Sequence, residues 1–244
     1  MGCGTLAASV TGVVMSLILA LDASSLLCSV ALGDGDQQWN ITELQPRRHA
    51  QRLLPMVDEV IAQSGMERES ISAIAYGRGP GSFTGIRIAA AVMQGLAMAL
   101  DVPVAGISSL QAVAQSVFER SQAEKILVVM DAHMGEVFWG IYQRDGAVCR
   151  PVSEEKVGAP ELCLQNIAAF DGELAGDGLA LEPFKHLSQQ WADRHPDACD
   201  ILKLALVAKD QGLFAEPEQH QPVYLRDSVA WKKLDEQPSL LKRN

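Results

Sequence analysis

The sequence predicts an α/β protein made of two related lobes, with the second lobe reduced. Short apolar runs bounded by Gly, Pro and Asp alternate with longer stretches whose apolar residues recur at helical spacing. The apolar run at 18–23, which ends in Asp-Ala, returns about 110 residues later at 127–132. Each run is followed by a turn and a second apolar run, at 28–32 and 137–142. Asp-Ala dipeptides are common enough for chance to be an alternative, but the matching hairpins favour a duplication.

The first lobe has the clearer elements. Residues 49–64 form a predicted helix because Leu53 and Val60 share one apolar stripe, and Gly65 suits a left-handed cap. Ser108 and Ser109 are expected to cap the helix that follows them. Further helices are predicted at 84–100 and from 109, and strands at 17–21, 28–32, 38–44, 71–76 and 102–107.

The second lobe is less regular, with helices predicted at 181–194 and 200–211. Residues 1–14 are rich in small side chains and lack the basic region of a secretory signal, so we expect a disordered extension or an upstream segment before a start at Met15. The predicted divisions are an extension at 1–14, an N-terminal lobe at 15–122, a C-terminal lobe at 123–227 and a tail at 228–244.

A glycine-rich loop at 77–87 joins an apolar strand to the helix at 84–100. Strand, glycine turn and helix is an arrangement whose backbone N–H groups can hold an anion, but the loop lacks the Lys-Ser or Lys-Thr pair of a P-loop. The alternative is a tight turn in which Ser82 or Thr84 caps the helix. Both remain open for binding, whereas catalysis by the loop is not expected. The candidate anion or nucleotide contacts in the loop are Gly81, Ser82, Thr84 and Gly85.

Two carboxylates follow the repeated strands and complete the candidate site. Asp22 and Asp131 could face each other across a cleft between the lobes, where they could hold hydrated magnesium or act as acid and base. In the alternative, each carboxylate accepts hydrogen bonds from the N–H groups of its own turn. No catalytic residue and no metal ligand is assigned, because no H-x-x-x-H pair and no nucleophile with its base is visible in the sequence.

The overall composition restricts the partners and the location. A formal net charge of −10 argues against tight direct binding of nucleic acid. Five cysteines without C-x-x-C spacing suit a reducing cytoplasm, and the apolar stretch at 13–21 is too short to span a membrane. The helix at 84–100 is apolar on nearly all sides, which predicts that part of its surface is an interface between subunits.

These motifs together resemble the TsaB (YeaZ) family over nearly the whole chain from Met15. The resemblance rests most specifically on the loop at 77–87 (GRGPGSFTGIR), and also on the segments at 18–25, 28–32, 131–137 and 222–226. His133 departs from the family pattern, which has Arg after Asp-Ala, and this weakens an anion role for that turn.

The resemblance implies a two-lobed actin-like, sugar-kinase-like (ASKHA) fold and a non-catalytic role. Such a subunit would work with TsaD, which transfers a threonylcarbamoyl group to the adenosine beside the anticodon of certain tRNAs, and with the ATPase TsaE. The resemblance implies that the chain has no cofactor of its own, although ATP, ADP or magnesium is possible within the complex. It also implies that the chain contacts tRNA mainly through the complex. The alternatives are a nucleotide-dependent kinase or ATPase that uses Asp22, Asp131 and the glycine loop, or a peptidase-like protein.

The resemblance also implies pairing through helices of the first lobe, as a homodimer in isolation or as a heterodimer with TsaD. By position, this pairing involves the helices at 49–64 and 84–100. The expected interface residues are Leu53, Met56, Val60, Ile88, Val92, Met93 and Leu96.

Overall fold

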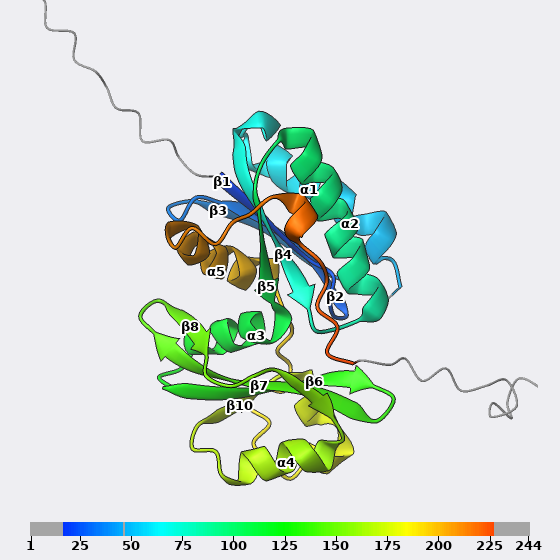
Figure 1. Cartoon of the computed structure of the whole chain (residues 1–244), viewed down its shortest axis with the longest axis vertical. Coiled ribbons are helices and arrows are strands. Elements are labelled where there is room, and N and C mark those ends of the chain that lie inside the picture. The colour runs from blue at the N-terminus through cyan, green and yellow to red at the C-terminus, as the bar shows by residue number, and fades with distance from the viewer. Residues whose placement is uncertain (1–16, 46, 227–244) are drawn as a thin grey trace, which may run out of the picture.

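Two five-stranded sheets lie one above the other in the computed structural model, which describes residues 17–45 and 47–226 (Figure 1). The expected extension at 1–14 and the tail at 228–244 lie outside these residues. Helices α3 (Ser109–Phe118) and α5 (Ala198–Asp210) occupy the space between the sheets. Helices α1 (His49–Ser64) and α2 (Phe83–Leu100) cover the outer face of the first sheet, and α4 (Pro160–Ala168) covers the outer face of the second.

The first sheet has the order β3-β2-β1-β4-β5, with β4 and β5 parallel to β1 and with β2 and β3 antiparallel. Its central strand is buried on both faces, which explains why the sequence there is a continuous apolar run rather than an alternating one. Leu19 and Leu21 face α1 and α2, whereas Ile18 and Ala20 face α5. The strands are β1 (Leu17–Asp22), β2 (Leu27–Gly33), β3 (Gln38–Leu44), β4 (Ile71–Gly79) and β5 (Val104–Ser108).

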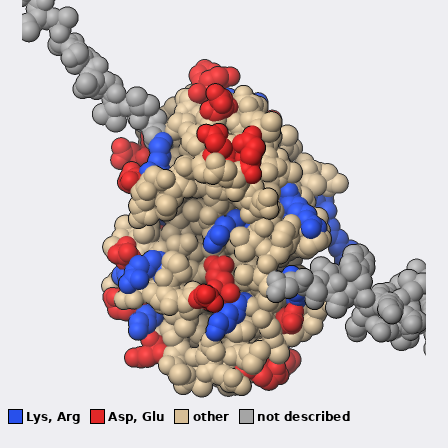
Figure 2. All heavy atoms as spheres, viewed as in Figure 1, with Lys and Arg blue, Asp and Glu red and all other residues tan. Residues whose placement is uncertain are grey.

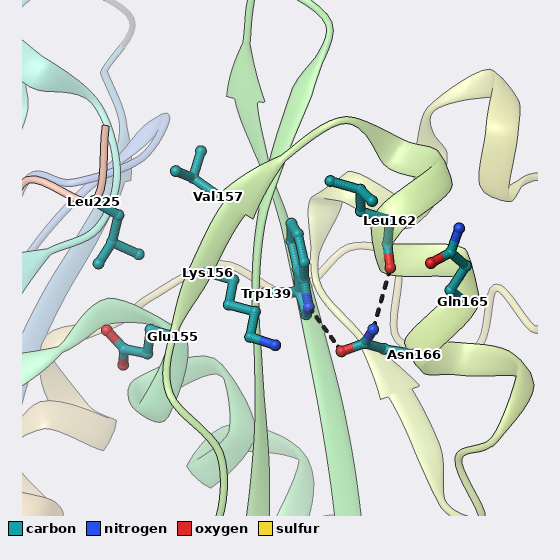
Figure 3. A pocket seen from close by; sticks show the side chains of 8 residues that line it. All are labelled: Trp139, Glu155, Lys156, Val157, Leu162, Gln165, Asn166 and Leu225. Atoms are coloured by element: carbon teal, nitrogen blue, oxygen red, sulfur yellow. Dashed lines mark hydrogen bonds between the residues drawn. The ribbon is translucent and has the colours of Figure 1, made fainter. Parts of the chain in front are cut away.

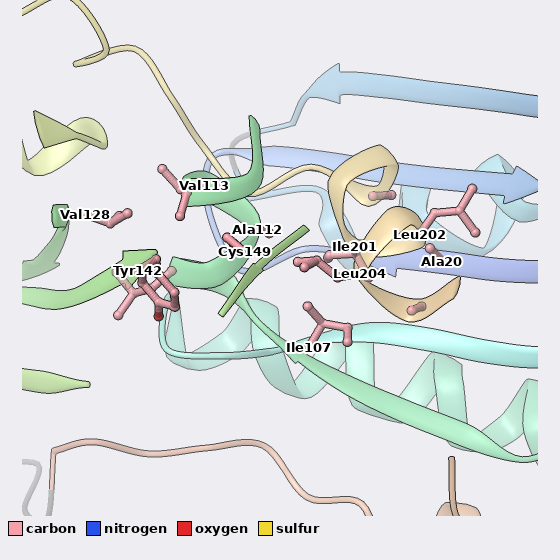
Figure 4. Close-up of a cluster of buried hydrophobic side chains, with 14 of the residues drawn as sticks. Ala20, Ile107, Ala112, Val113, Val128, Tyr142, Cys149, Ile201, Leu202 and Leu204 are labelled. Carbon is pink, nitrogen blue, oxygen red and sulfur yellow. The ribbon is translucent and has the colours of Figure 1, made fainter. Parts of the chain in front are cut away.

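The second sheet has the order β10-β6-β7-β8, and β9 also pairs with β7. One face packs on α3 and the other on α4, again in alternation along β6. The cluster that contains α3 and α5 joins the two lobes in one core, which includes Ile107 of β5, Tyr142 of β7 and Ile201 of α5 (Figure 4). The strands are β6 (Lys125–His133), β7 (Glu136–Asp145), β8 (Val148–Pro151), β9 (Lys156–Gly158) and β10 (Glu173–Ala175).

The predicted duplication is visible in the topology. Each sheet begins with an antiparallel hairpin, β1–β2 or β6–β7, and adds a parallel strand beside the first, β4 or β10. The parallel strand β10 has only three residues where β4 has nine, so the second copy is reduced. The α/β class and the two-lobed fold are therefore confirmed.

Two helices pack across the boundary between the sheets. Helix α3, which precedes the second sheet in the chain, packs on β6 and β7, and α5, which follows that sheet, packs on β1 and β2. The crossed packing joins the lobes through two helices.

The helix predicted at 181–194 is wrong. This stretch begins with the 3₁₀ turn Glu182–Phe184, and further turns follow it. Leu181, Phe184 and Leu187 recur every three residues, and each amide donates to the carbonyl three residues earlier. Three-residue spacing places all three side chains on one face of a 3₁₀ turn, where they pack against the core beneath the second sheet.

By length and composition, α2 is the one helix among the described residues that could cross a membrane. A core helix passes the same test, and Ile86, Ala89 and Met93 of α2 are buried in the protein.

Candidate functional site

The glycine loop is held against the turn between β1 and β2. The Ser82 N–H donates to the Ser24 carbonyl at 2.7 Å, and the Ser82 Oγ accepts from the Gly85 N–H at 3.3 Å, which caps α2. A Cβ on Gly85 would lie 1.8 Å from the Ala23 carbonyl oxygen, and one on Gly81 would lie 2.3 Å from the Ser24 carbonyl oxygen. The two glycines are therefore required by close backbone contact.

A cavity of about 700 Å³ lies between this loop and the second lobe. It gathers five of the six residues predicted to bind an anion or nucleotide: Gly81, Ser82, Thr84, Gly85 and Asp131. Its walls also include four charged or titratable side chains that the sequence did not single out as ligands, Arg47, His49, His133 and Asp177. They come from three separate parts of the chain, and the glycines on either side of Asp177 are a local signal of a turn there.

Asp22, the sixth residue, is buried beneath the cavity and does not line it. Its Oδ2 accepts from the Ser24 N–H at 2.9 Å and from the Ser24 hydroxyl at 3.0 Å. Its Oδ1 lies against the backbone of Gly77, where a Cβ would be 1.9 Å away, and has no hydrogen-bond partner among the described residues. Burial raises the pKa of Asp22 from 3.8 to about 7. We therefore correct Asp22 from a ligand contact to a residue that shapes the β1–β2 turn.

Asp131 also bonds its own turn. Its Oδ1 accepts from the His133 N–H at 2.7 Å, and its Oδ2 lies 3.2 Å from the His133 Nδ1. The Asp131 N–H donates to Asp177, which also pairs with His195 at 3.5 Å and raises the pKa of that imidazole. Because Asp22 does not reach the cavity, the predicted pair of facing carboxylates is not formed. No group of three or more His, Cys, Asp or Glu that could hold a metal ion occurs among residues 17–45 and 47–226.

We expect Asp22→Asn to stabilise the protein increasingly as the pH rises from 5 to 8. The pKa of the Asp22 carboxyl is raised from 3.8 to about 7 on folding, so the folded state binds the proton more tightly than the unfolded state. The free energy of unfolding of the wild type therefore falls as the pH rises from about 4 to about 7. The shift corresponds to a total loss of about 4 kcal/mol, of which about 2 to 3 kcal/mol falls above pH 5. Denaturant unfolding at pH 5 and pH 8 measures the difference from wild type. For the control Asp36→Asn, at an exposed position, the difference from wild type in the free energy of unfolding should be the same at pH 5 and pH 8. A constant difference for Asp22→Asn would contradict this assignment.

The expected interface residues divide into two groups. Leu53, Met56, Val60 and Met93 are completely buried inside the first lobe, so they are core residues and we correct their assignment as partner contacts. Ile88, Val92 and Leu96 lie half-buried at the surface of α2. They form part of an apolar surface, here called the α2 face, which consists of Ile88, Ala91, Val92, Gly95, Leu96, Met98 and Ala99.

A second, open cavity of about 400 Å³ lies on the second lobe between β7, β9 and α4 (Figure 3). The Trp139 Nε1 donates to Asn166 at 3.4 Å, and Asn166 donates in turn to the Leu162 carbonyl at 3.2 Å. None of the predicted site residues lines it.

The fold and the site define the class of the protein. A family model described as "TsaD: tRNA N6-adenosine threonylcarbamoyltransferase" matches residues 41–183. The fold also matches the YeaZ structure from Pseudomonas aeruginosa with a TM-score of 0.76 and 39% identity, covering 86% of this chain and 100% of that one. Another Pseudomonas aeruginosa structure, described as an uncharacterized protein with similarity to peptidase YEAZ, matches with a TM-score of 0.79 and 42% identity over 87% of this chain and 100% of that chain. The class is therefore the two-lobed α/β fold of TsaD and its relatives.

Within this class, the chain belongs to the TsaB family. It is 39% identical to the tRNA threonylcarbamoyladenosine biosynthesis protein TsaB of Escherichia coli (strain K12), over 89% of this chain and 97% of that protein. It is 38% identical to the protein of the same name from Haemophilus influenzae, over 89% of this chain and 96% of the relative.

Proposed function

We propose that this chain is a non-catalytic partner subunit in tRNA threonylcarbamoyladenosine synthesis. In this role it binds TsaD and, together with TsaE, supports transfer of the threonylcarbamoyl group to the adenosine next to the anticodon. The observation that carries the proposal is the exposed, apolar α2 face on a chain that belongs to the TsaB family.

The α2 face has the features of a surface that another protein covers. Gly95 lies in the middle of α2, and a Cβ added there would meet no atom of residues 17–45 and 47–226 within 4 Å. Glycine inside a helix destabilises it by about 1 kcal/mol relative to alanine. No contact inside the lobe requires this glycine, whereas a second helix that approaches closely would. Met98 is 69% exposed beside it, and Leu54 of α1 is 46% exposed. We infer that this surface pairs with TsaD, and with a second copy of the chain when TsaD is absent.

The charge of the molecule supports indirect contact with tRNA. Acidic and basic side chains are interspersed on the face drawn in Figure 2, without a continuous basic surface. With a net charge of −10, the chain is poorly suited to neutralise phosphates by itself. We therefore propose that tRNA is held mainly by the rest of the complex, and that the chain works in the cytoplasm.

The direct test is an omission experiment. The purified chain is mixed with TsaD, TsaE, tRNA and threonylcarbamoyl-adenylate, and the modified nucleoside is measured by mass spectrometry. We expect modification only when the chain is present, with omission of TsaD as the negative control. Equal modification without the chain would contradict the proposal.

We also propose that the cavity between the lobes can admit an anionic ligand such as ATP or ADP within the complex. Arg47, the N-terminus of α2 and the Thr84 hydroxyl lie on one wall, while Asp131 and Asp177 on the other wall oppose additional negative charge. Calorimetric titration of ADP into the chain alone and into its complex with TsaD tests this. We expect binding that Arg47→Ala weakens, and no heat in either sample would contradict it.

Catalysis by the chain itself is not favoured by these contacts. Among the described residues, Ser82 has no hydrogen bond to a His or Asp that could activate it, and its Oγ is engaged by the Gly85 N–H. A kinase or ATPase would show nucleotide turnover by the isolated chain, which the same purified sample can be used to measure.

A further inference from the structure

The segment 215–226 runs from the first lobe to the second across the glycine loop (Figure 1, orange to red). It starts beside β5, where Ala215 and Val104 exchange backbone hydrogen bonds at 2.8 and 2.9 Å. The 3₁₀ turn Pro217–Gln219 then contacts α2, and the His220 ring lies edge-on to Tyr76 at 6.1 Å between centroids. The segment therefore follows the first lobe before it crosses.

The middle of the segment is fixed to the glycine loop and to the start of α2. The Val223 N–H donates to the Arg78 carbonyl at 2.8 Å. Gly79 leaves room for the Val223 carbonyl, because a Cβ on Gly79 would lie 3.0 Å from the Val223 carbonyl oxygen. The Tyr224 hydroxyl accepts from the Arg87 Nε at 2.9 Å. The Arg87 guanidinium lies over the Phe83 ring at 3.3 Å, and the Phe83 and Tyr224 rings are 5.7 Å apart.

The end of the segment is fixed to the second lobe. The Arg226 guanidinium pairs with Glu136 and donates to the carbonyls of Ala132 at 3.2 Å and His133 at 3.5 Å. Ala132 and His133 end β6 and Glu136 begins β7, and residues 131–136 are here called the β6–β7 turn. Asp131 and His133 of this turn line the cavity. The ion pair is partly buried, with the Arg226 side chain 26% exposed and the Glu136 side chain 38% exposed, so water screens it less than a fully exposed pair.

We propose that residues 222–226 form an interlobe clasp, which holds the β6–β7 turn at a fixed distance from the glycine loop and the start of α2. Tyr224 and Arg226 are its two anchors, one on each lobe, and the cavity lies between the elements that they hold. The clasp sets the width of the cavity and couples the β6–β7 turn to α2. Its effect on TsaD binding rests on the proposed function, whereas its effect on lobe opening does not.

Hydrogen exchange of the full chain tests the clasp without reference to any partner. Arg226→Ala should speed amide exchange by about tenfold both in the β6–β7 turn and in the glycine loop, because the anchor on one lobe restrains the other. The midpoint of global unfolding should change little, and the strands of both sheets should exchange as in wild type. Faster exchange in the β6–β7 turn alone would overturn the proposal, since Arg226 would then stabilise only its own contacts.

A double-mutant cycle separates the clasp from two independent contacts. Loss of either anchor releases the same segment. The double variant Tyr224→Ala with Arg226→Ala should therefore speed amide exchange no more than the single variant with the larger effect. Multiplicative effects of the two substitutions would contradict a shared clasp. The control Tyr224→Phe keeps the ring against Phe83 and removes only the hydroxyl, and it should have a smaller effect than Tyr224→Ala.

The same variants connect the clasp to partner binding. Arg226→Ala should weaken TsaD binding several-fold. If amide exchange is faster in both lobes but the affinity for TsaD is unchanged, the clasp stands and only its coupling to α2 is overturned. If even the wild-type chain fails to bind TsaD, the proposed function fails and the exchange result still decides the clasp.

Discussion

Replacing Val92 by glutamate is expected to abolish TsaD binding while the chain stays folded. Val92 lies half-buried in the centre of the α2 face, next to Gly95 and Leu96. In the free chain its new carboxylate can turn towards water, but in a closed interface it would be buried without a partner. An unpaired buried charge destabilises a contact by about 3 to 5 kcal/mol, which is more than a hundredfold in affinity.

Calorimetric titration with TsaD measures this loss, and light scattering measures the homodimer under the same conditions. The control is Leu213→Glu, which places the same charge at a leucine that is 60% exposed and lies outside the α2 face. It should bind TsaD as wild type does, and the thermal unfolding of both variants should stay close to that of wild type. Unchanged TsaD affinity and unchanged mass for Val92→Glu would contradict the assigned interface.

Replacing the adjacent Met93 by glutamate is expected to unfold the first lobe. Met93 is fully buried on the opposite side of α2, in the core that contains Leu19, Leu21 and Ile74. A carboxyl there loses the packing of the methionine and has no partner, so we expect a loss of about 3 to 5 kcal/mol or more in the free energy of unfolding. This is comparable to the whole stability of a marginal domain.

Denaturant unfolding of the soluble variant, or its failure to accumulate as soluble protein, measures the effect. Met98→Glu is the matched control, because it makes the same substitution on the same helix at a side chain that is 69% exposed. Its free energy of unfolding should change by only about 0.5 kcal/mol. If Met93→Glu is as stable as Met98→Glu, the orientation of α2 described above is incorrect.

The contrast between these two residues shows what sequence could and could not predict. Helix α2 is apolar on nearly all sides. Its sequence therefore does not show which side faces the core and which side lies at the surface. In α1 the stripe with Leu53 and Val60 is clear, but such a stripe marks the face that a helix buries in its own lobe. This is why these residues belong to the core rather than to the interface.

The sequence predicted helix caps correctly, because a cap depends on residues that are close together in the chain. Gly65 adopts the left-handed conformation at the end of α1, and Ser108 caps α3 as predicted. Ser82 caps α2, which is one of the two caps that the sequence left open. The duplicated hairpins were visible because each lobe repeats the same strands. Non-local arrangements were not visible: the burial of Asp22 against Gly77 and the approach of Arg47 and Asp177 to one cavity depend on the packing of distant segments.

We propose that the chain acts through a protein interface and not through chemistry at its own carboxylates. The most direct measurement is tRNA modification in the reconstituted system with wild type, Val92→Glu and Asp22→Asn compared at equal concentration. We predict that Asp22→Asn supports modification as wild type does and that Val92→Glu supports none. Full activity of Val92→Glu together with loss of activity in Asp22→Asn would contradict the account.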